Sequence, residues 1–113
     1  MIHVVATLTV KPGTRSEFLG EFQRMVPQTL AEDGCLGYEP LIDCPAGVHT
    51  RQISERAEVV TVVERWRDLA ALQAHLVAPH MAAYRERVKH LVVSGSLQIL
   101  RVPEPGADSA QRG

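Results

Sequence analysis

Residues 59–66 constrain the fold of this chain more than any other segment. The side chains of a β-strand point alternately to its two faces. One face of this segment carries Val60, Val62, Glu64 and Trp66, and the other carries Val59, Thr61, Val63 and Arg65. Both faces are therefore partly apolar, so a sheet built around this strand must be covered on both sides.

The rest of the chain alternates between strand and helix patterns. Ile2–Val10 alternates as a strand, and the segment after Lys11-Pro12-Gly13 has an apolar stripe at helical spacing up to Leu30. A short strand is expected over Gly37–Cys44, a polar loop or irregular edge strand over Val48–Ala57, and a last strand over Leu97–Val102. Two helices are expected between the last two strands, one after Asp68 and one beginning at Pro79.

Three local signals refine these boundaries. Thr14 and Glu17 have the spacing of a capping box at the start of the first helix. Pro27 should kink or divide that helix near Met25. Ser94-Gly95-Ser96 is typical of a turn and should precede the last strand.

The order strand, helix, strand, strand, helices, strand predicts an α+β, ferredoxin-like (split βαβ) fold, with an antiparallel sheet and its helices on one face. Val5 on the first strand, with Val59 and Val63 or Val60 and Val62 on the third, leaves the other face partly apolar. A second copy of the chain would cover it and give a dimer, whereas cover by the chain's own polar loop is the alternative. We expect one domain over residues 1–102 and a disordered tail over residues 103–113, which is rich in Pro, Gly and polar residues.

Composition excludes several classes of function. The 113 residues carry a formal net charge of −1, so a broad surface for nucleic acid is not expected. No apolar run is long enough to span a membrane, and the first residues indicate a strand instead of an export signal, which predicts a cytoplasmic protein. Cys35 and Cys44 are then expected to be reduced thiols.

The segment from residue 64 to residue 84 holds the residues best suited to chemistry: Glu64, Trp66, His75, His80 and Tyr84. An imidazole can move a proton at cellular pH, and two aromatic rings can stack on a flat ligand. Each also has a structural interpretation, since histidines at helix borders and buried aromatic residues are common parts of a core.

Glu64 stands out because it shares a face with apolar side chains. A carboxylate in such a place needs a partner, and a structural ion pair with Arg87 or Arg101 is as good an explanation as function. A metal site is not expected. The spacing of five between His75 and His80 separates them by about 140° on a straight helix, and only His49 and Glu64 offer themselves as further ligands. Glu32-Asp33, at a helix end, is expected to be solvated.

Several stretches together resemble a known family. They span residues 2 to about 103 in order, and they include Glu32-Asp33-Gly34-Cys35-Leu36-Gly37-Tyr38, Asp43-Cys44-Pro45-Ala46-Gly47-Val48, Glu64-Arg65-Trp66 and Ala74-His75-Leu76-Val77-Ala78-Pro79-His80-Met81. The chain resembles the antibiotic biosynthesis monooxygenase superfamily, and within it the quinol monooxygenase subfamily. The resemblance implies a homodimer with the form of an α+β barrel. It also implies oxidation of a quinol or related hydroxylated aromatic compound by dioxygen, without flavin, haem or metal.

Under this hypothesis His75 is the base that removes a hydroxyl proton, and Trp66 and Tyr84 form the walls around the ring. His80 or Glu64 would orient the base or relay the proton, and His49 could approach the cleft from the polar loop.

Three other functions stay open. The dimer could bind a quinone or polyketide without catalysis, or serve a purely structural role. It could also resemble the branch of the superfamily that isomerises phosphorylated sugars, for which Arg65, Arg85 and Arg87 would supply positive charge. The haem-degrading branch has an asparagine on the first strand and a tryptophan in the helix after the third, where this chain has Ala6 or Thr7 and His75.

Overall fold

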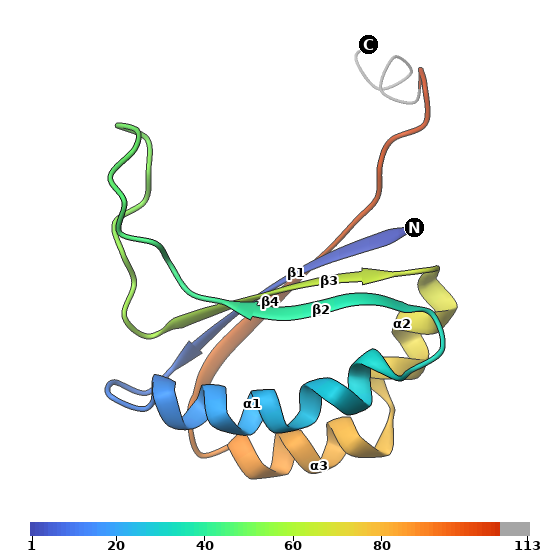
Figure 1. The fold of residues 1–113 in the computed structure, drawn as a ribbon, viewed down its shortest axis with the longest axis horizontal. Helices are drawn as coiled ribbons and strands as arrows, with labels where there is room; N and C mark the ends of the chain where they lie inside the picture. Colours follow the sequence, from blue (N-terminus) through green and yellow to red (C-terminus); the bar gives the residue numbers. More distant parts are fainter. Residues whose placement is uncertain (107–113) are drawn as a thin grey trace.

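The computed structural model describes residues 1–106, which form one four-stranded sheet and three helices (Figure 1). The elements in chain order are β1 (Ile2–Val10), α1 (Arg15–Leu30), β2 (Cys35–Leu41), β3 (Val59–Trp66), α2 (Leu69–Leu76), α3 (Pro79–Val88) and β4 (Val92–Leu100). The expected order is confirmed, with the last strand beginning earlier than predicted.

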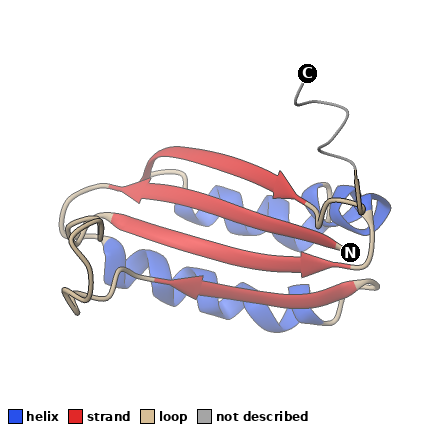
Figure 2. Cartoon of the chain, turned by 90° about the horizontal axis from the view of Figure 1, so that it is seen from above, coloured by secondary structure: helices blue, strands red, loops and turns tan. Residues whose placement is uncertain are grey.

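The sheet has the strand order β2-β3-β1-β4, and every neighbouring pair is antiparallel. All three helices lie on one face of this sheet, and the other face is bare (Figures 1 and 2). This is the ferredoxin-like arrangement that the sequence predicts. Of the described helices, none has the length and apolar character that a membrane span needs.

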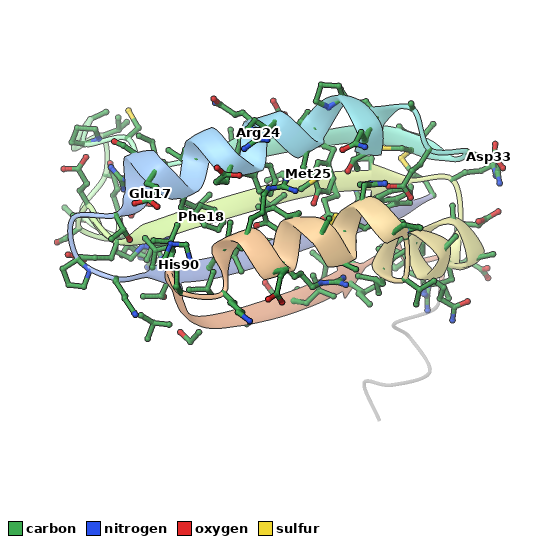
Figure 3. All side chains as sticks on the ribbon, turned by 90° about the horizontal axis from the view of Figure 1, so that it is seen from below. Glu17, Phe18, Arg24, Met25, Asp33 and His90 are labelled. Carbon is green, nitrogen blue, oxygen red and sulfur yellow. The ribbon has the colours of Figure 1, made fainter. Side chains whose placement is uncertain are left out.

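The core lies between the sheet and α1, and it follows the alternation of the strands. Val4 on β1 and Val60 on β3 point inward and are fully buried. Phe18 and Met25 on α1 meet them from the helix layer and are also fully buried (Figure 3). Burial of this stripe holds α1 against the sheet and leaves room beside it for α3.

The start of α1 differs from the sequence expectation. Thr14 makes no side-chain cap; its hydroxyl instead donates to the carbonyl of Lys11 at 2.7 Å. The hydroxyl is therefore committed to the preceding turn, and the predicted capping box does not form. Pro27 lies within α1 without dividing it.

The predicted turn at Ser94-Gly95-Ser96 is wrong, because these residues lie inside β4 and pair with β1. Gly95 lies opposite Leu8, and a Cβ at Gly95 would come within 2.9 Å of Leu8 Cδ2. The glycine therefore serves close packing within a strand and not a change of direction.

The structure also gives the bounds of β2, of the loop after it and of the described part of the predicted tail. β2 begins at Cys35 and ends at Leu41, earlier than the predicted strand. Residues 42–58 form the expected loop, which projects on the bare side of the sheet (Figure 1). Residues 103–106 are exposed and belong to no helix or strand, and the rest of the predicted tail lies outside the described residues.

Candidate active site

A cavity of about 480 Å³ lies between the inner face of the sheet and the helices. Its walls are mainly apolar and come from all four strands and all three helices, with Ala6, Val62, Phe22, Met81 and Leu97 among them. Six cavity residues carry titratable groups and offer chemistry: Tyr38, Glu64, His75, Tyr84, Arg85 and Lys89. The volume is within the range of sites that hold small ligands.

His75 lies in the last turn of α2, with its side chain 2% exposed. The position follows from the sequence: Asp68 caps α2 by accepting from the backbone N–H of Ala71 at 2.9 Å, and β3 ends at Trp66 just before this cap. The imidazole lies against the indole of Trp66, with ring centroids 4.7 Å apart. Tyr38 approaches the same imidazole edge-on at 5.2 Å.

The Glu32 carboxylate makes a hydrogen bond with one nitrogen of this imidazole. The distance from His75 Nδ1 to Glu32 Oε2 is 2.7 Å, and the Glu32 side chain is 15% exposed. Because a carboxylate can only accept, Nδ1 carries the proton and donates it to Glu32. Nε2 of His75 then keeps a free lone pair, which is the state a general base requires. Glu32 is therefore not the solvated acid that the sequence suggested.

His80 reaches the same carboxylate from α3. Its Nε2 lies 3.0 Å from Glu32 Oε2 and 3.2 Å from the hydroxyl of Thr29. α2 ends at Leu76, and α3 restarts at Pro79 in a new direction. The two imidazoles are therefore not separated as on one straight helix, and their ring centroids are 6.3 Å apart.

Burial shifts the pKa values of three side chains at the cavity. Burial lowers the pKa of His75, and the hydrogen bond and charge of Glu32 oppose this effect. His75 is thus neutral at physiological pH. Burial raises the pKa values of the Tyr38 and Tyr84 phenols, so both stay protonated against the cavity.

Glu64 has a partner that the sequence did not suggest. The indole Nε1 of Trp66 donates to Glu64 Oε1 at 2.9 Å, from the next inward position on the same strand. Neither expected arginine takes this role: Arg87 donates to Glu21 at 2.8 Å, and Arg101 lies exposed beyond the end of β4. Burial raises the pKa of Glu64, and the Trp66 hydrogen bond opposes this rise.

The structure brings together most of the residues singled out from the sequence. His75, Glu64 and Tyr84 line the cavity. Trp66 is fully buried beneath His75 and is not among the cavity residues, so its ring supports the imidazole instead of forming a wall.

His49 is not part of the site. It lies exposed in the loop of residues 42–58, where its Nδ1 accepts from the backbone N–H of Arg51 at 3.0 Å. Sequence reasoning also missed Glu32 and Tyr38. The pairing of β2 with β3 sets Cys35 opposite Trp66, next to the start of α2. Glu32 comes shortly before β2 and Tyr38 lies on β2, so this pairing brings both of these residues close to α2.

Comparison with known proteins gives consistent results. The family model described as Antibiotic biosynthesis monooxygenase matches residues 1–87. The Escherichia coli K12 protein named Probable quinol monooxygenase YgiN is 39% identical over 103 residues, which cover 89% of this chain and 97% of that protein. The crystal structure of PA3566 from Pseudomonas aeruginosa is similar with a TM-score of 0.73 and 25% identity, over 91% of this chain and 94% of that one. The structure of Rv0793 from Mycobacterium tuberculosis gives the same score and identity, over 91% and 95%.

Proposed function

Because this chain belongs to the antibiotic biosynthesis monooxygenase family, we propose that it oxidises a quinol, or a related hydroxylated aromatic compound, with dioxygen and without a cofactor. One observation carries the proposal: His75 lines a largely apolar cavity while Glu32 holds its Nδ1–H at 2.7 Å. The name of the E. coli relative supports the choice of a quinol as substrate.

The cavity binds the flat ring of the substrate. Tyr38 and Tyr84 supply aromatic walls, and both phenols stay neutral, so they place no charge against the ring. Apolar side chains supply the remaining surface and keep bulk water from the reactive intermediates. Trp66 fixes the imidazole from behind.

His75 starts the reaction by taking one hydroxyl proton of the quinol on Nε2. Glu32 stabilises the imidazolium that forms, because its carboxylate already accepts the Nδ1–H. The quinolate is electron-rich enough to pass one electron to dioxygen, which gives superoxide and a semiquinone radical.

The two radicals then join through a carbon–oxygen bond, and His75 returns its proton to the resulting peroxide. Loss of water from this hydroperoxide removes the ring C–H proton, breaks the O–O bond and leaves a new carbonyl. The substrate thus gains one oxygen atom and gives up four electrons in all. The second oxygen atom leaves as water.

The test measures oxygen uptake after a reduced naphthoquinol, mixed with the protein under anaerobic conditions, is exposed to air. His75→Asn keeps an N–H near the Nδ1 position for Glu32 but has no Nε2. We expect its oxygen uptake to fall by about 10²–10⁴ relative to wild type, the usual worth of a general base. His90→Ala is the matched control, because His90 is exposed, lies near Glu17 (Figure 3) and does not line the cavity.

Two results would contradict the proposal. If folded His75→Asn turns over at the wild-type rate, His75 is not the base. If wild type binds the naphthoquinol tightly without raising oxygen uptake above the spontaneous rate, the protein is a carrier and not an oxygenase.

We also propose that the bare face of the sheet binds a second copy of the chain. Val5 and Val63 are paired at its centre and half-buried, and Leu41 and Leu100 lie farther out on the same face. Such a patch favours a self-complementary twofold interface. Light scattering of the wild-type chain should give the mass of a dimer, and Val63→Arg should give a monomer. A monomeric wild type at micromolar concentration would contradict this.

A further inference from the structure

We propose that Glu32, His75 and His80 form a binding site for a divalent transition-metal ion, with Zn²⁺ as the best-suited ion. The ligand atoms are Glu32 Oε2, His75 Nδ1 and His80 Nε2, and all three lie within 4.8 Å of one another. Two imidazoles and one carboxylate are a ligand set that zinc uses when a fourth position is left for water.

Two of the three ligand contacts already have nearly the spacing that a zinc ion requires. Tetrahedral ligands at about 2.0–2.1 Å from zinc lie about 3.3 Å from one another. Glu32 Oε2 is 2.7 Å from His75 Nδ1 and 3.0 Å from His80 Nε2. An ion therefore needs these two contacts to lengthen by about 0.6 Å and about 0.3 Å.

The fold holds the three ligands on separate elements. Glu32 follows α1, His75 lies in the last turn of α2, and His80 lies in the first turn of α3 directly after Pro79. The backbone N–H of Ala78 donates to the carbonyl of His75 at 3.1 Å, which fixes the turn between the two histidines. The site is thus assembled by the tertiary fold, as expected for a preformed metal site.

Access for the ion comes from the protein surface. A hollow of about 390 Å³ opens beside Glu32 and is lined by Asp33, Arg67 and Ala74 among others. Water from this side can supply the fourth ligand. The hydroxyl of Thr29, 3.2 Å from His80 Nε2, is a further oxygen close to the site.

Metal binding would compete with the base. An ion on His75 Nδ1 displaces the proton that Glu32 accepts, so the neutral ring must carry its proton on Nε2 instead. In that tautomer Nε2 has no free lone pair. This consequence rests on the proposed function: Zn²⁺ should inhibit oxygen uptake, and removal of zinc by a chelator should restore it.

The test titrates ZnCl₂ into chelator-treated, full-length protein by isothermal titration calorimetry. We expect one ion per chain, and at least about tenfold weaker binding for Glu32→Gln and for His80→Ala. Asp33→Asn and His49→Ala are matched controls, because Asp33 is an exposed neighbouring acid paired with Arg67, and His49 lies in the distant loop. Both controls should bind like wild type, and circular dichroism checks that each variant is folded.

The outcomes separate the two proposals. Absence of zinc binding by wild type, or binding that folded Glu32→Gln and His80→Ala both leave unchanged, overturns the metal site whatever the oxygen uptake. Zinc binding with the expected losses supports the site even if the zinc-free protein does not oxidise a quinol, and in that case only the proposed function fails.

Discussion

Replacing Glu64 by glutamine should stabilise the protein at neutral pH and leave its stability nearly unchanged at acidic pH. Burial raises the pKa of Glu64 above its ordinary value of 4.5, and the Trp66 hydrogen bond only opposes this rise. The folded protein therefore holds the Glu64 proton more strongly than the unfolded chain does. The stability that this bound proton contributes is fully present below about pH 4.5 and is lost as the pH rises through the folded-state pKa of Glu64.

The magnitude follows from the surroundings of the carboxylate. Glu64 is 5% exposed, and within residues 1–106 Trp66 is the side chain that donates to it. Burying a charged group that has a single side-chain donor costs on the order of 1–3 kcal/mol. Glutamine has nearly the same shape and offers an amide oxygen to the Trp66 N–H. We therefore expect Glu64→Gln to gain on the order of 1–2 kcal/mol at pH 8.

Urea unfolding of wild type and Glu64→Gln from pH 4 to pH 8 measures this difference directly. The gap between the two free energies of unfolding should widen as the pH rises and close near pH 4. Glu55→Gln is the control, because Glu55 is exposed in the loop and should show no such change. If Glu64→Gln is no more stable than wild type at pH 8, or if the gap does not depend on pH, the account of Glu64 as a buried, poorly solvated acid is wrong.

Three substitutions test the local structure by the same urea assay. Gly34→Ala should lose about 2–3 kcal/mol, because Gly34 has a φ of 85° and a Cβ there would lie 2.6 Å from the Cβ of Ala71; wild-type stability would contradict this geometry. Asp68→Ala should lose about 1 kcal/mol with the cap of α2. Thr14→Ala should lose no more than about 0.5 kcal/mol, since Thr14 caps no helix, and equal losses for the two variants would refute the assignment of the caps.

The fold could be predicted because its strands and helices carry strong local patterns. The alternation in β1 and β3 fixes which side chains point inward, and the same alternation is seen as buried and half-buried positions in the structure. The order of the elements then leaves few arrangements of the sheet. The error in β4 has a physical cause: Ser94-Gly95-Ser96 has the composition of a turn, but the glycine is there to fit against Leu8.

The site could be predicted only in part, because its central contacts join residues far apart in the sequence. His75 was found because an imidazole is conspicuous beside a buried stripe. Glu32 was missed, since an acid next to Asp33 at a helix end is usually solvated. In the structure Asp33 does meet solvent and pairs with Arg67, while Glu32 turns toward the imidazoles.

The break between α2 and α3 explains why both histidines lie close to the same carboxylate, that of Glu32. On a single helix a spacing of five would separate their side chains by about 140°. Pro79 cannot continue α2 without loss of a backbone hydrogen bond, so the chain turns at Val77-Ala78 and α3 begins with His80 in its first turn. Pro79 thus brings both rings to one carboxylate. A Pro79→Ala variant that joined the two helices would separate the rings and leave Glu32 with His75 alone.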